Sequence, residues 1–175
     1  MAITKIQSES LNLADTYDFT GTVTGAGGAN TPFFYGEPSD GSFTRGAYTK
    51  VTGMTNNEID TDSAFDGATF TVPSGQAGKY FFEGFVTGNF SAVGSDGEMV
   101  GASIYKNGSS VKDARWQISP QQAGIMHFLT TSVNIILDLS VGDYVELYGY
   151  IADFSAQTSS ISGNRSSFLG YKIIE

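Results

Sequence analysis

Four carboxylates between residues 58 and 66 form the strongest candidate for metal chemistry in this sequence. They are Glu58, Asp60, Asp62 and Asp66. Carboxylate oxygens are the hard ligands that Ca²⁺ prefers, and the acids stand at alternate positions at the start of this segment. An EF-hand loop that begins at Asp60 does not fit, because the glycine position is occupied by Phe65. We therefore favour solvated loop acids over a calcium site, and we expect no other cofactor.

Acid–base catalysis depends on a single histidine, His127. A hydroxyl nucleophile needs an adjacent base, and Gly-x-Ser-x-Gly is absent. His127 has the parity of Leu129 and Val133, which predicts a buried or half-buried structural side chain. The chain has no cysteine, which excludes a thiol nucleophile, a thiolate zinc site and a disulfide framework. We expect no enzymatic activity, since one histidine also disfavours a cupin-like or glycosidase enzyme on a jelly roll.

Tyrosines recur on one parity in a segment near the C-terminus. Tyr144, Tyr148 and Tyr150 would share one face of a strand. Tyrosine gives a large contact area at a small entropy cost, so this face could bind a ligand. Packing beneath a loop is equally compatible with the pattern. Trp116 beside Arg115 allows the same two interpretations.

Composition and charge exclude several classes of protein. The chain has 9 basic and 18 acidic residues, a net charge of −9, and no basic stripe that could bind a nucleic-acid backbone. No run approaches the roughly 18 apolar residues of a membrane span. The first ten residues also lack the apolar region of a secretory signal.

The elements that must position these residues are strands. Only 15 % of the residues are charged, and turns rich in Gly, Ser and Thr separate runs of β-branched and aromatic residues, which predicts an all-β domain. Asn107-Gly108 predicts a hairpin turn. The expected strands lie at 43–50, 58–60, 69–72, 79–87, 99–106, 110–117, 126–137, 144–151 and 167–174.

The expected strand at 79–87 is apolar on both faces. Tyr80, Phe82 and Val86 share one parity, and the opposite parity carries Phe81 and Phe85. A strand that is apolar on both faces is covered on both faces, and a second subunit is the simplest cover for Phe81 and Phe85.

The segment before Ser42 has no apolar set that could close a core. We interpret residues 1–41 as an extended N-terminal arm and residues 42–175 as the folded domain. The aromatic run at 33–35, between two prolines, is expected to be extended within the arm. The apolar residues that could anchor the arm are Leu11, Leu13, Tyr17, Phe19 and Val23.

Four motifs, in order, resemble the globular head of the complement C1q family. Residues 62–82 contain DSAFDGATFTVP and then GKYFF, similar to the family's Tyr-Asp…Gly-x-Phe-x-x-Pro…Gly-x-Tyr-x-Phe signature. Residues 104–108, IYKNG, resemble the family's hairpin. Residues 139–147 resemble its Leu-x-x-Gly-Asp-x-Val block, and residues 166–171 resemble its closing Ser-x-Phe-x-Gly-Phe strand.

This resemblance implies a ten-stranded jelly-roll sandwich of the C1q and tumour-necrosis-factor type, assembled as a homotrimer. In the family, the Gly-x-Tyr-x-Phe strand and the last strand line the three-fold interface. By analogy, Phe81, Phe85, Ile136 and Phe168 would lie between subunits. Some relatives with this fold bind calcium near the trimer apex, but their ligands have no clear counterparts here. The chain lacks a collagen-like stem, so complement-type partners are not implied.

Residues 10–28 resemble segments that recur in virion structural proteins of bacteriophages, where they precede trimeric fibre, appendage or decoration heads. The resemblance implies a non-enzymatic virion protein that is assembled in the host cytoplasm. Its arm would bind other virion proteins, and its exposed head would attach to a glycan or protein of the host surface. The alternative is a free-standing glycan- or protein-binding C1q-like recognition module.

Overall fold

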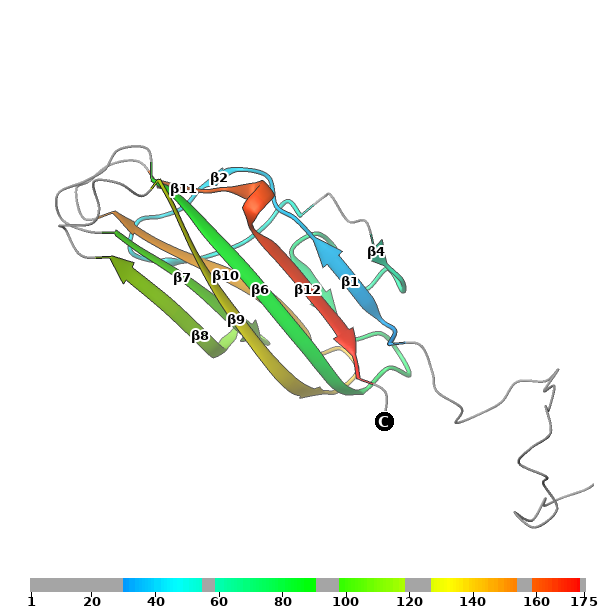
Figure 1. Cartoon of the computed structure of the whole chain (residues 1–175). Helices are drawn as coiled ribbons and strands as arrows, with labels where there is room; N and C mark the ends of the chain where they lie inside the picture. Colours follow the sequence, from blue (N-terminus) through cyan, green and yellow to red (C-terminus); the bar gives the residue numbers. More distant parts are fainter. Residues whose placement is uncertain (1–29, 55–58, 91–97, 119–126, 154–158, 174–175) are drawn as a thin grey trace, which may run out of the picture.

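The computed structural model describes residues 30–54, 59–90, 98–118, 127–153 and 159–173, which form a two-layered β-sandwich (Figure 1). Among these residues there is no helix with the length and apolar character needed to cross a membrane. The elements are β1 (Phe33–Gly36), β2 (Gly41–Ser42), β3 (Tyr48–Lys50), β4 (Ile59–Asp60), β5 (Thr69–Thr71), β6 (Gly78–Phe90), β7 (Glu98–Lys106), β8 (Ser109–Ile118), β9 (Phe128–Leu139), β10 (Tyr144–Asp153), β11 (Ser159–Ile161), the 3-10 helix η2 (Gly163–Arg165) and β12 (Ser167–Lys172).

The strands divide into a seven-stranded and a five-stranded sheet, and their pairing is antiparallel. β6 is central in the seven-stranded sheet because it pairs with β9 along one edge and with β12 and β11 along the other. β1 and β4 extend this sheet beyond β12. The five-stranded sheet has the order β3-β10-β7-β8, and β5 also pairs with β10. The first and last strands of the sandwich, β1 and β12, are therefore neighbours, as Figure 1 shows.

Alternation along the strands sends one set of side chains into a single core between the sheets. In β6 the buried set is Tyr80, Phe82 and Val86, each 0 % exposed, so the predicted parity of this strand is confirmed. The hairpin predicted at Asn107-Gly108 is also confirmed. Both residues have positive φ, 50° and 77°, which matches the backbone of a two-residue hairpin turn between β7 and β8.

Aromatic rings fill the part of the core beneath β1. Phe34 is 0 % exposed. Its ring centroid lies 4.4 Å from that of Phe65 and 5.1 Å from those of Phe70 and Phe168. The folded domain therefore begins no later than Phe33, the first residue of β1, and not at the predicted boundary at residue 42. The remainder of the predicted arm, including Leu11, Leu13, Tyr17, Phe19 and Val23, lies outside the described residues.

The strands differ from the expected set in three places. β1 and β11 were not expected, and the single strand expected at 43–50 is reduced to β3, with β2 just before it. The chain between β2 and β3 turns at Gly46, whose φ is +72°. β11 is short and mostly polar, and its position depends on the strands beside it, β6 and β2. The structure thus has twelve described strands, not ten.

Candidate functional site

The outer face of the five-stranded sheet carries a cluster of tyrosines around one arginine. The predicted Tyr144, Tyr148 and Tyr150 do share this face, because the intervening positions of β10 point into the core. We call this surface the tyrosine–arginine face. It consists of Tyr48, Tyr105, Tyr144, Tyr148, Tyr150 and Arg115.

The Arg115 side chain extends from β8 over the neighbouring strands, because strand register places Arg115 in one row with two of the tyrosines. The row runs from Arg115 on β8 through Gly101 on β7 to Tyr150 on β10 and Tyr48 on β3. The guanidinium carbon of Arg115 is 4.5 Å from the ring centroid of Tyr150 and 4.9 Å from that of Tyr48. The Nε of Arg115 also donates a hydrogen bond to the Tyr48 hydroxyl, at 3.2 Å. The arginine is therefore held by two rings and one hydroxyl.

Gly101 makes this row possible. A Cβ at position 101 would lie 3.0 Å from the Tyr150 Cβ and 3.1 Å from the Arg115 Cγ. These separations are too short for ordinary side-chain packing. The missing side chain therefore lets Arg115 extend over β7 and reach the tyrosine rings.

A second row of tyrosines continues the face. Tyr105 and Tyr148 are stacked, with centroids 3.9 Å apart and planes inclined by 25°. Tyr48 meets Tyr105 edge-on at 6.5 Å. Tyr144 lies at the start of β10, and its ring is not part of these ring contacts among the described residues.

The two basic side chains on this face, Lys50 and Arg115, differ in their partners. Lys50 and Glu146 form an ion pair at 2.6 Å, and Glu146 is 7 % exposed. Arg115 is exposed, and the structure shows no ion pair between it and any residue of the described ranges. The hydrogen bond with Tyr48 raises the pKa of Arg115, and burial raises the pKa of Tyr48. At neutral pH this face therefore presents a charged guanidinium beside the protonated hydroxyl of Tyr48.

The outer face of the seven-stranded sheet carries an apolar row. Register aligns Ile136 on β9, Phe81 on β6, Tyr171 on β12 and Phe33 on β1. The Phe81 and Tyr171 ring centroids are 5.4 Å apart, and Tyr171 meets Phe33 edge-on at 6.3 Å. Ile136 is 59 % exposed. Phe81, Phe85 and Ile136 thus point outward. For Phe81 and Phe85 this is the face opposite to the buried side chains of β6.

Phe168 does not belong to this outer face, so its predicted place between subunits is wrong. Its side chain is 0 % exposed, and its ring lies 6.0 Å from that of Phe82 in the core. The inward positions of β12 include Phe168, because the outward parity belongs to Leu169 and Tyr171. Those two side chains occupy the outer face instead.

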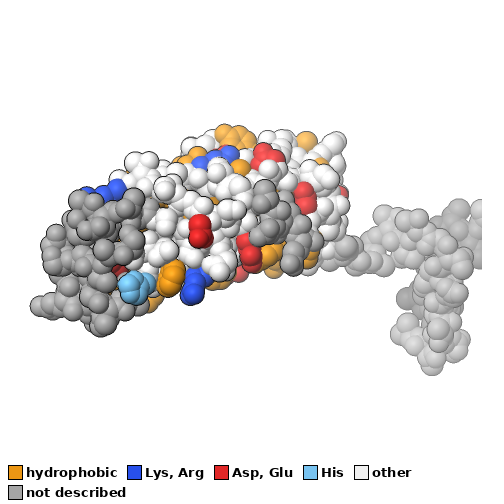
Figure 2. Space-filling view, turned by 90° about the horizontal axis from the view of Figure 1, so that it is seen from above, with side chains coloured by type: hydrophobic (Ala, Val, Ile, Leu, Met, Phe, Trp, Pro, Cys, Tyr) orange, Lys and Arg blue, Asp and Glu red, His pale blue; other side chains and the backbone are white. Residues whose placement is uncertain are grey.

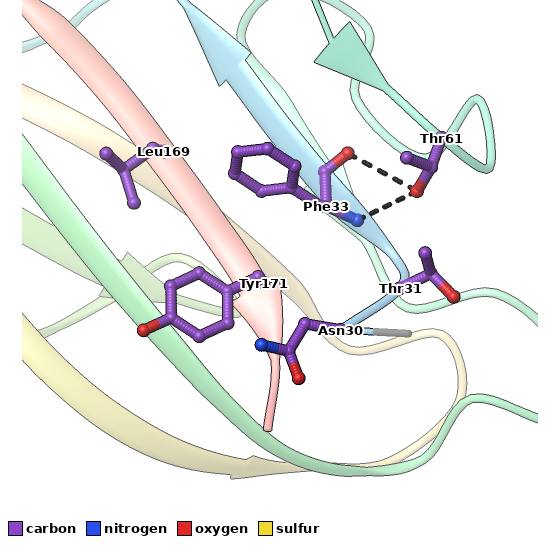
Figure 3. Close-up of a pocket in the computed structure, with 6 residues that line it drawn as sticks. All are labelled: Asn30, Thr31, Phe33, Thr61, Leu169 and Tyr171. Carbon is purple, nitrogen blue, oxygen red and sulfur yellow. Dashed lines mark hydrogen bonds between the residues drawn. The ribbon is translucent and has the colours of Figure 1, made fainter. Parts of the chain in front are cut away.

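A pocket of about 490 Å³ lies at the β1 end of the apolar row (Figure 3). The rings of Phe33 and Tyr171 border it, and the Thr61 hydroxyl fixes the nearby backbone by accepting a hydrogen bond from the Phe33 N–H at 2.9 Å. The lining residues are Asn30, Thr31, Phe33, Thr61, Leu169 and Tyr171. The apolar row therefore ends in a recess beside the point where the N-terminal segment joins the sandwich.

The candidate calcium ligands do not converge on one point among the described residues. Glu58 lies outside those residues. Asp60 accepts hydrogen bonds from backbone N–H groups four and five positions later, at 3.0 and 3.3 Å. Asp66 accepts the N–H of Thr69 at 2.7 Å, and Asp62 accepts the hydroxyl of Thr61 at 2.8 Å. Within the described ranges no group of three or more acidic or histidine side chains could hold a metal ion.

His127 is exposed, so the prediction of a buried or half-buried histidine is wrong (Figure 2). It lies just before β9, which begins at Phe128, and the alternation of that strand does not extend to it. Its carbonyl oxygen accepts the N–H of Phe90 at 2.9 Å, which ties the backbone here to the end of β6.

No family model matches this chain, and no curated protein matches it. Among solved structures, the globular domain of a zebrafish complement 1qA protein has a similar fold, with a TM-score of 0.52. The two share 16 % sequence identity over 83 % of this chain and 99 % of that one. This likeness concerns the fold, and it confirms the predicted all-β jelly roll of the C1q type.

Proposed function

From this C1q-type jelly roll, we propose that the chain is a non-enzymatic structural protein of a virion, as a capsid decoration, fibre or appendage. Three copies form a trimer through the outer face of the seven-stranded sheet. The segment before the sandwich binds other virion proteins, and the head is exposed and available for attachment to a host surface. The protein is assembled in the host cytoplasm.

The apolar row on the seven-stranded sheet is the observation that carries this proposal. Ile136, Phe81, Tyr171 and Phe33 follow one another across four strands, and Phe85 lies four residues further along β6 on the same face. Contiguous apolar surface of this kind marks an interaction site. Burying it yields about 25 cal/mol per Å² of apolar area. A closed ring of three identical subunits buries the row in every copy.

The proposed attachment role follows from the N-terminal segment. The start of the sandwich at Pro32 lies beside its last strand, because the Lys172 N–H donates a hydrogen bond to the Pro32 carbonyl at 3.0 Å. In a trimer, three arms would leave from corresponding positions. Several weak contacts to a particle would then combine into strong binding. The resemblance of residues 10–28 to phage virion segments supports a particle as the partner.

Replacing Phe81 with aspartate tests the interface. We expect the wild-type chain to have the mass of a trimer in light scattering, and Phe81→Asp to have the mass of a folded monomer. Val141→Asp is the matched control, because Val141 is 52 % exposed in the turn before β10, away from the row. A monomeric wild-type chain, or a trimeric Phe81→Asp variant, would contradict the proposed interface.

Removing residues 1–29 tests the arm. The truncated chain should retain the circular dichroism spectrum of the folded head and lose incorporation into particles when co-expressed with the virion proteins. Undiminished incorporation of the truncated chain would show that the arm is not the attachment element.

A second candidate function, a free-standing glycan- or protein-binding module, is favoured by the tyrosine–arginine face. That face lies on the sheet opposite the apolar row, so a trimer that buries the row leaves it accessible. A glycan array probed with the wild-type chain and with Tyr148→Ala tests this role. Saturable binding that the variant loses would support recognition by this face.

A further inference from the structure

We infer that the tyrosine–arginine face binds an acidic saccharide, with the acidic group of the sugar on Arg115. The inference rests on the proposed recognition role of the head and names the class of ligand. It concerns the centre of the face, where Arg115 meets Tyr48 and Tyr150.

Arg115 is prepared to bind an anion. Its guanidinium is fixed over two rings, at 4.5 and 4.9 Å from their centroids, and its Nε is engaged by the Tyr48 hydroxyl. The terminal nitrogens make no hydrogen bond or ion pair that the structure shows within the described residues. A planar guanidinium presents paired donors that match a carboxylate, and one held in place loses little entropy on binding. An acidic group can therefore bind without displacing a protein partner.

The neighbouring cation on the face is already neutralised. Lys50 donates to Glu146 at 2.6 Å and to the Thr69 hydroxyl at 2.7 Å. The chain as a whole carries a net charge of −9, so its long-range field does not attract polyanions. Binding of an acidic ligand here must therefore come from short-range contact with Arg115.

The surroundings of Arg115 favour a saccharide over a peptide. Arg115 lies on β8, the edge strand of this sheet, but its side chain extends away from the edge, over β7 and onto the Tyr150 ring of β10. A ligand on the guanidinium therefore lies over strands that are paired on both sides, where a peptide strand cannot be added. The half-buried tyrosines offer negatively polarised ring faces, which attract the C–H groups of a sugar ring, and hydroxyls that can bond its hydroxyls. A face with rings, hydroxyls and one cation that is outside any ion pair among the described residues matches a pyranose that carries an acid.

Calorimetric titration of the full chain with an oligogalacturonate and with its methyl ester tests the inference. The two probes share their rings, but the ester has lost the charge. We expect the acid to bind, and the ester to bind about 10- to 100-fold more weakly. Arg115→Lys keeps the charge but loses the paired guanidinium N–H donors and the stacking on the rings. It should weaken binding of the acid by a similar factor. Lys112→Gln, an exposed cation on β8 with the opposite parity, should leave binding unchanged.

Three further results decide the ligand class. Binding of a sulfated oligosaccharide with the same dependence on Arg115 supports an acidic saccharide and identifies sulfate as its acid. Equal binding of the ester, or of poly-glutamate, overturns the inference. Absence of binding by every probe also overturns it, whereas the trimer mass from light scattering tests the proposed assembly independently.

Discussion

The burial of Phe34 gives the sharpest test of where the folded domain begins. If residues 1–41 were an arm, replacing Phe34 would have almost no effect on stability. In the structure Phe34 is 0 % exposed and contacts the rings of Phe65, Phe70 and Phe168 at 4.4 to 5.1 Å. Phe34→Ala should therefore strongly destabilise the sandwich.

The size of the effect follows from these contacts. A buried Phe→Ala substitution costs about 3–5 kcal/mol, and each aromatic pair contributes about 0.5–1.5 kcal/mol beyond its buried area. With three close rings around Phe34, we expect a loss near the upper end, about 4–5 kcal/mol of unfolding free energy. For a chain of this length, that loss lowers Tm by roughly 8–20 °C. Phe34→Leu should lose about 1–2 kcal/mol.

Urea unfolding followed by far-UV circular dichroism measures the loss. All variants are compared at one protein concentration, because assembly makes apparent stability depend on concentration. Phe128→Ala is the control. Phe128 is 38 % exposed and contacts the Arg165 guanidinium at 4.2 Å, so its loss should cost about 1 kcal/mol or less. A loss below about 1 kcal/mol for Phe34→Ala would refute the inclusion of β1 in the core.

Two further predictions concern packing and pH. Gly84→Ala would place a Cβ 2.4 Å from the Leu147 Cδ1 and should cost about 1–3 kcal/mol in urea unfolding. Gly41→Ala, whose nearest neighbour would be at 3.7 Å, should be tolerated, and equal stability of the two variants would contradict the packing of β6 on β10. A hydrogen bond from the Asn107 side chain is the main cause that lowers the pKa of Asp143 from 3.8 to about 2. Because the folded pKa is the lower one, this stabilisation is complete above pH 3.8 and is lost as the pH falls toward 2. Asp143→Asn should therefore reduce the fall of Tm over this interval in thermal melts, and an unchanged fall would show that the carboxylate makes no such contribution.

The longer strands were predictable because their periodicity is local. β6 to β10 each appear in the sequence as an alternating or apolar run, and Asn107-Gly108 identifies the hairpin. β1 was not predicted, since four residues between two prolines carry too little periodicity to separate a strand from an extended arm. The burial of Phe34 comes from pairing with β12, far away in the chain.

The candidate site was predictable only in part for the same reason. The parity of β10 places Tyr144, Tyr148 and Tyr150 on one face without knowledge of the neighbouring strands. Tyr48 and Tyr105 join them only through the order β3-β10-β7, which no local pattern encodes. Phe168 was misplaced because family analogy assigned a whole strand to the interface, whereas alternation buries every second residue of β12.

The pairing of β1 with β12 has a consequence for synthesis on the ribosome. Translation proceeds at about 5–20 residues per second, so β1 emerges roughly ten seconds before its hydrogen-bonding partner. During that interval the edge of β1 that pairs with β12 stays open, and β1 carries the aromatic residues Phe33, Phe34 and Tyr35. Nascent chains stalled before Ser167 cannot close this edge. Chaperone protection of incomplete chains should therefore end only when the last strand leaves the exit tunnel.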